Sequence, residues 1–97
     1  MAKPWRVARS MIRDYWRNIS TYISGTSEAD IKEQVYAETA AREILDSLYK
    51  HPDIPPLVLL EEYRNLMDEY STRSLTNSWL YSVKKDTAQF FIDSLMR

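Results

Sequence analysis

Apolar residues recur every three or four positions along most of the chain, which is the spacing of one face of an α-helix. In the first such stretch, from about Pro4 to Ser24, they fall within an arc of roughly 140° at about 100° per residue. This face holds Trp5, Ala8, Met11, Ile12, Tyr15, Trp16, Ile19, Tyr22 and Ile23. Because proline suits the first helical turn and glycine suits the end of a helix, a helix is predicted from Pro4 to just before Gly25.

Two further helices are predicted in the middle of the chain. One begins near Ser27, which has the spacing of a capping box with Asp30, and ends before Pro52, which cannot continue a helix. Its predicted buried face consists of Ile31, Val35, Ala41, Ile44, Leu45 and Leu48. The next helix begins at the proline pair 55–56 and ends near Tyr70. Its apolar positions are Leu59, Leu60, Tyr63, Leu66, Met67 and Tyr70.

The apolar face changes direction within residues 74–97. Leu75, Trp79 and Val83 share one face, whereas Ala88, Phe91 and Leu95 share another. One bent helix and two helices that meet near Lys85 both explain this shift. We expect a break or kink at Lys85, because residues 86–89 (Asp-Thr-Ala-Gln) also fit a capping box.

No segment alternates between apolar and polar residues with period two, so strands are not expected. The sequence therefore predicts one all-α domain over residues 1–97. Its expected architecture is a compact bundle of four to five helices, mostly antiparallel and joined by short loops.

Composition excludes several kinds of site. The chain has no cysteine, one histidine (His51) and one glycine. Disulfides, thiolate metal sites, paired zinc-binding histidines and glycine-rich phosphate loops are therefore excluded. We expect no catalytic residues, no cofactor and no metal, and a protein that is not an enzyme. The absence of an export signal and of a transmembrane stretch predicts a cytoplasmic location.

Acidic residues leave one enzymatic alternative open. Glu61, Glu62, Asp68 and Glu69 cluster on the predicted third helix, and helix-borne carboxylates can hold Mg²⁺ when a second helix adds ligands. These four positions lie mostly away from the apolar face. A solvated acidic surface is therefore the favoured interpretation.

Charge is distributed unevenly along the chain. Residues 1–24 carry five Lys/Arg and one Asp, a net charge of +4, and the remaining residues carry −5. Arg6, Arg9, Arg13 and Arg17 form a basic flank within roughly 80° of the first helix. This flank is solvated, pairs with acidic helices, or binds a protein, nucleic acid or an anionic membrane. The acidic isoelectric point, about 5.8, argues against nucleic acid.

Two tyrosines, Tyr36 and Tyr81, lie outside the main apolar arcs of their helices. Tyrosine is enriched at protein interfaces, although it also covers small cores with its hydroxyl in water. With the four arginines, these tyrosines are the candidate partner-binding residues. We interpret the chain as a non-enzymatic protein–protein interaction or regulatory module that self-associates, for example as a homodimer. Nucleic-acid binding by the basic flank is the alternative.

Overall fold

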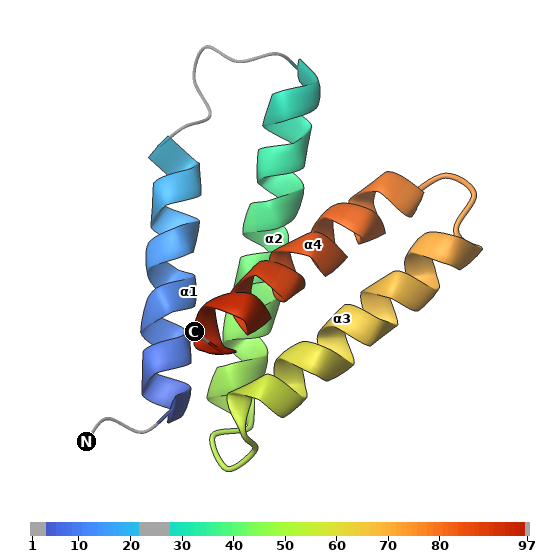
Figure 1. Ribbon diagram of the computed structural model, residues 1–97. Coiled ribbons are helices and arrows are strands. Elements are labelled where there is room, and N and C mark those ends of the chain that lie inside the picture. Colours follow the sequence, from blue (N-terminus) through green and yellow to red (C-terminus); the bar gives the residue numbers. More distant parts are fainter. Residues whose placement is uncertain (1–3, 22–27, 97) are drawn as a thin grey trace.

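The computed structural model describes residues 4–21 and 28–96, which form four α-helices. These are α1 (Pro4–Thr21), α2 (Glu28–Lys50), α3 (Pro56–Arg73) and α4 (Ser78–Met96). Helices α1 and α2 lie side by side and antiparallel, and α3 and α4 form a second antiparallel hairpin that crosses the first (Figure 1). The predicted all-α bundle is confirmed. None of the described helices combines the length and the apolarity needed to cross a membrane.

Prolines set the boundary between α2 and α3, as predicted. After Lys50 the His51 N–H donates to the Ser47 carbonyl at 3.0 Å, and the chain then turns. Pro56 occupies the first position of α3, where its missing N–H is not needed. The carbonyl of Pro55 accepts hydrogen bonds from the next turn of α3 at 3.0 and 3.3 Å.

A short turn joins α3 to α4. Its backbone is held by the Ser74 N–H, which donates to the Tyr70 carbonyl at 2.9 Å. The Ser74 hydroxyl oxygen in turn accepts a hydrogen bond from the Asn77 N–H at 2.9 Å. This hydroxyl satisfies a backbone donor just before α4 begins, which helps to fix where the helix starts.

The predicted break near Lys85 is wrong, because α4 continues from Ser78 to Met96. Residues 86–89 all lie inside the helix, and the Thr87 hydroxyl donates to the Val83 carbonyl at 2.9 Å, so the predicted capping box does not start a helix. The apolar face shifts because α4 packs against α2 on one side and α3 on the other. Its buried face is therefore wide enough to include Lys84 and Thr87.

The core lies where the two hairpins cross. All four helices contribute to it: Ala8, Ile12, Ala41, Ile44, Leu48, Leu59, Leu60, Ala88, Phe91 and Ile92. Phe91 is among the largest fully buried side chains. The alanines of α1, α2 and α4 let the crossing helices approach closely, since interaxial distances depend on the side chains at the contact.

Several residues predicted to be buried are exposed instead. They are Val35 in the first half of α2, Leu66 and Tyr70 in the second half of α3, and Leu75 in the turn, which is fully exposed. The crossing explains this result, because the ends of α2 and α3 extend beyond the shared core (Figure 1).

Candidate interaction surface

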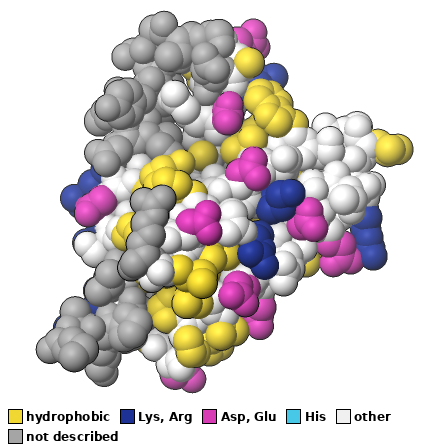
Figure 2. Space-filling model, in the orientation of Figure 1, with side chains coloured by type: hydrophobic (Ala, Val, Ile, Leu, Met, Phe, Trp, Pro, Cys, Tyr) yellow, Lys and Arg dark blue, Asp and Glu magenta, His cyan; other side chains and the backbone are white. Residues whose placement is uncertain are grey.

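A pocket of about 190 Å³ lies where α1 and α2 meet α4. Its lining combines aromatic, aliphatic and acidic side chains from the three helices: Tyr15, Glu33, Ala37, Val83, Asp86, Thr87 and Phe90. On the face shown in Figure 2, apolar and acidic side chains are interspersed over α2 and α4. We call this pocket the acidic–aromatic pocket.

Two aromatic rings, Tyr15 and Phe90, line the pocket, and the buried Phe91 ring packs against Tyr15. The ring centroid of Tyr15 lies 5.0 Å from that of Phe91, edge to face, and 5.2 Å from that of Phe90. Phe91 is fully buried, whereas its neighbour Phe90 is 49% exposed. The core therefore anchors Tyr15, and Tyr15 in turn supports an exposed Phe90 ring.

Two carboxylates give the pocket a negative potential. Glu33 of α2 and Asp86 of α4 are exposed, and no described basic side chain forms an ion pair with either of them. Burial raises the pKa of the Tyr15 hydroxyl, and the negative charge of Glu33 raises it further. Both effects disfavour a tyrosinate, so the pocket offers neutral rings beside fixed negative charges.

A second exposed aromatic side chain lies on the same face of α4, nearer the start of the helix. Trp79 lies eleven residues before Phe90, so both project from nearly the same face of the helix. Its ring packs edge to face on Tyr36 of α2, with centroids 5.6 Å apart, and it remains 44% exposed. We call Tyr15, Tyr36, Trp79 and Phe90 the aromatic edge. Tyr36, a predicted interface residue, belongs to it.

Tyr81 lies elsewhere. It is two residues from Trp79, on the opposite side of α4, and packs on Tyr70 of α3 with centroids 5.2 Å apart. The structure therefore does not bring together the two tyrosines that the sequence pairs as candidate partner-binding residues.

Two of the four arginines of the basic flank, Arg9 and Arg13, contact Tyr49 of the same chain. The Arg9 guanidinium lies 4.7 Å above the Tyr49 ring, and Arg13 Nη2 donates to the Tyr49 hydroxyl at 3.1 Å. Both arginines are half-buried, whereas Arg6 and Arg17 are exposed. The flank thus helps to fasten α1 to the end of α2. Nucleic-acid binding by this flank stays a prediction.

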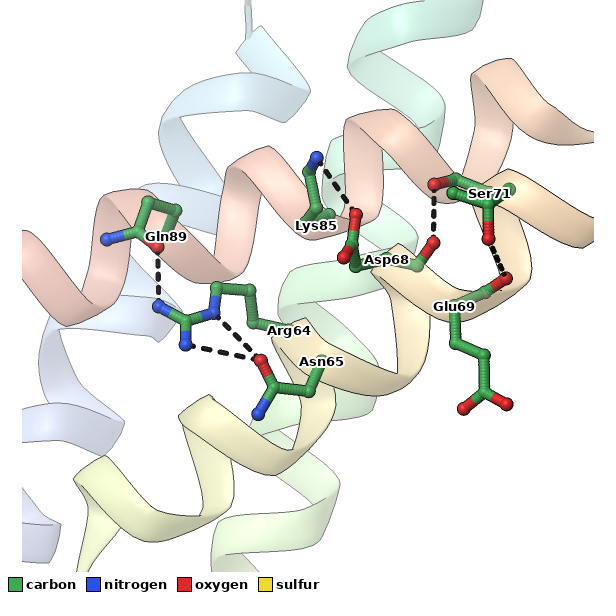
Figure 3. A network of polar contacts seen from close by, with 8 residues as sticks. Arg64, Asn65, Asp68, Glu69, Ser71, Lys85 and Gln89 are labelled. Atoms are coloured by element: carbon green, nitrogen blue, oxygen red, sulfur yellow. Dashed lines mark hydrogen bonds and ion pairs between the residues drawn. The ribbon is translucent and has the colours of Figure 1, made fainter.

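A second groove, of about 350 Å³, runs between α3 and α4 and is lined by polar and charged residues. It is lined by Arg64, Asn65, Asp68, Lys85, Asp86 and Gln89. Figure 3 shows its contacts: Arg64 Nη1 donates to Gln89 Oε1 at 2.8 Å, and Lys85 Nζ lies 3.3 Å from Asp68 Oδ1. Because the Arg64–Gln89 and Lys85–Asp68 contacts join the two helices, we interpret the groove as a link within the hairpin. Asp86 lines both this groove and the acidic–aromatic pocket.

Glu43, Tyr63 and Lys84 form a polar contact beside the core that the sequence pattern does not reveal. Lys84 Nζ lies 2.8 Å from Glu43 Oε1, and the Tyr63 hydroxyl donates to the same oxygen at 2.8 Å. Burial, and then the hydrogen bond to Glu43, raise the pKa of Tyr63 strongly. The three residues connect α2, α3 and α4, and they stand away from the acidic–aromatic pocket.

Within residues 4–21 and 28–96, no three acidic, histidine or cysteine side chains converge as metal ligands. The four acidic residues of α3 that the magnesium alternative requires are all exposed. No known family, curated protein or solved structure matches this chain.

Proposed function

We propose that this chain is a non-enzymatic protein–protein interaction module that self-associates through the aromatic edge. The observation that carries the proposal is the half-exposure of Trp79 and Phe90 on one face of α4. Exposed aromatic clusters are typical of interfaces, where tyrosine, tryptophan and phenylalanine are enriched.

The size of this surface indicates weak association. A Trp or Phe side chain buries about 150–250 Å² when fully enclosed, so covering the exposed half of each removes about 90 Å² from water. At about 25 cal/mol per Å² this contributes about 2 kcal/mol for each ring. Association costs at least about 4 kcal/mol in lost translational and rotational freedom. Burial of the two rings alone therefore does not give stable association, and neighbouring contacts must contribute additional binding free energy. We therefore expect assembly that depends on protein concentration.

The charge pattern supports a second copy as the partner. The chain as a whole carries −1, but its first 24 residues carry +4 and the remainder −5. Two copies, each with a net charge of only −1, therefore repel each other weakly overall, and the basic part of one can meet the acidic part of the other.

The test is the mass in solution as a function of concentration, by light scattering coupled to size-exclusion chromatography. We expect a mass above the 11.5 kDa of the single chain at high concentration, and a shift towards 11.5 kDa for Phe90→Ser and Trp79→Ser. Leu75→Ser is the matched control, because Leu75 is fully exposed but lies off the edge. A wild-type mass of 11.5 kDa at every concentration would rule out self-association.

A further inference from the structure

We propose that the acidic–aromatic pocket binds the guanidinium group of Arg17 from a second copy of this chain. The inference rests on the self-association proposed above and assigns the contact that directs it.

The pocket has the chemistry that a guanidinium group requires. A guanidinium stacks on aromatic faces and binds carboxylates in a bidentate manner. Tyr15 and Phe90 supply the rings, and Glu33 and Asp86 supply carboxylates from two different helices. Burial, and after it the negative charge of Glu33, raises the pKa of the Tyr15 hydroxyl, so this ring stays neutral.

The pocket has room for one side chain. A volume of about 190 Å³ corresponds to about six water molecules at roughly 30 Å³ each. An arginine side chain has seven heavy atoms beyond Cα, so its guanidinium end fits a space of this size. The surrounding aromatic edge would then cover the remainder of the contact.

Among the arginines of the basic flank, Arg17 is the best placed to contact a second copy of the chain. It is exposed, and no described residue forms a hydrogen bond or ion pair with it. Arg9 and Arg13, by contrast, are held at Tyr49.

The contact must form between copies. Arg17 follows Tyr15 by two residues, so the two side chains project about 160° apart around α1 and Arg17 cannot turn into its own pocket. Each copy therefore offers a donor on one side of α1 and a pocket on the other. Such a contact is heterologous, and it extends into a ring or a longer chain unless one end is blocked.

This geometry allows a complementation experiment with two variants. Arg17→Glu removes the donor and keeps the pocket, whereas the double variant Glu33→Gln/Asp86→Asn neutralises the pocket and keeps the donor. All three side chains are exposed, so the fold should survive, which circular dichroism checks. Arg73→Glu on α3 is the control for the same change of charge. The readout is the solution mass of each protein alone and of the two variants mixed.

We expect each variant alone to associate at least roughly tenfold more weakly than wild type, since loss of one charged partner raises Kd by about this much or more. The Arg73→Glu control should assemble like wild type. The equimolar mixture should form a complex of two chains and no larger species, because it contains only one intact donor–pocket pair.

Three results would overturn the inference. If wild type assembles and both variants assemble equally well, the pocket is not the contact, although self-association stands. If only the pocket variant loses assembly, Arg17 is not the donor. If both lose assembly but the mixture does not recover a two-chain complex, donor and pocket do not meet. A wild-type chain that never assembles refutes the proposed function itself.

Discussion

Removal of the Glu43 carboxylate should destabilise the fold more than removal of the lysine it pairs with. The Lys84 side chain is buried, with only 10% of its surface exposed. Its Nζ lies 2.8 Å from Glu43 Oε1. Lysine is almost never buried in this way unless it is paired. The Tyr63 hydroxyl also donates to Glu43 Oε1, so one carboxylate serves two helices.

The burial of the two side chains determines how much unfolding free energy Glu43→Ala should remove. Breaking a fully buried ion pair by deleting one partner costs about 3–5 kcal/mol. The Glu43 side chain is 46% exposed, however, so water reaches the ammonium once the carboxylate is gone. We therefore expect Glu43→Ala to lower the free energy of unfolding by about 2 kcal/mol, or to lower Tm by about 10 °C for a domain of this size.

Lys84→Met should cost less than about 1 kcal/mol, because the methionine fills the same space and the remaining Glu43 stays half in water. Adding Lys84→Met to Glu43→Ala should then restore stability, since it removes the unpaired charge. Lys84→Met should thus destabilise the wild-type protein slightly but stabilise the Glu43→Ala variant. This change in the sign of its effect distinguishes an electrostatic cause from a simple loss of packing.

Urea unfolding followed by circular dichroism measures all three variants. Glu69→Ala is the control: the Arg73–Glu69 pair is equally short, at 2.8 Å, but its arginine is 74% exposed. We expect it to cost less than about 0.5 kcal/mol. The reasoning fails if Glu43→Ala and Glu69→Ala cost the same, or if Lys84→Met is the more damaging change.

Three further predictions concern single residues. Burial and the hydrogen bond to Glu43 raise the pKa of Tyr63, so the unfolded chain loses this proton first. The free energy of unfolding should therefore fall as pH rises past about 10, by up to about 1.4 kcal/mol per pH unit. Tyr63→Phe should reduce that slope in urea titrations at alkaline pH. Because α4 is continuous, Lys85→Gly should be about 1 kcal/mol less stable than Lys85→Ala by thermal unfolding; equal stabilities would indicate a break. Tyr49→Phe keeps the ring beneath Arg9 and should cost less than about 0.5 kcal/mol, whereas Tyr49→Ala should cost about 1 kcal/mol in the same assay.

Helix positions follow from the sequence because their signals are local. The end of α2 and the start of α3 are fixed by prolines, whose missing N–H acts at the residue itself. The continuity of α4 could not be predicted this way. Periodicity gives the direction of an apolar face but not its width, and the width of this one depends on two neighbouring helices.

The candidate site is less visible because three helices build it. Nothing in their own segments links Tyr15, Glu33 and Asp86 to one another, and only the packing of α1, α2 and α4 brings them together. One local signal does exist. Phe90 and Phe91 are adjacent and thus about 100° apart on the helix, so a narrow core face can hardly enclose both rings. This adjacency alone indicates that one of the two rings is exposed, and in the structure it is Phe90.

The Lys84–Glu43 ion pair and the proposed aromatic edge lie on different sides of α4, and this separation can be tested. Lys84 projects roughly 120° away from Phe90 around the helix, towards Glu43, whereas Phe90 lies beside Tyr15. Glu43→Ala should therefore lower Tm and leave the concentration dependence of assembly unchanged well below that Tm. Phe90→Ser should weaken assembly while costing little stability, because half of its ring already meets water. If Phe90→Ser instead lowered Tm as much as Glu43→Ala, the exposed ring would be a structural part of the α1–α4 contact and the aromatic edge would lose its role as an interface.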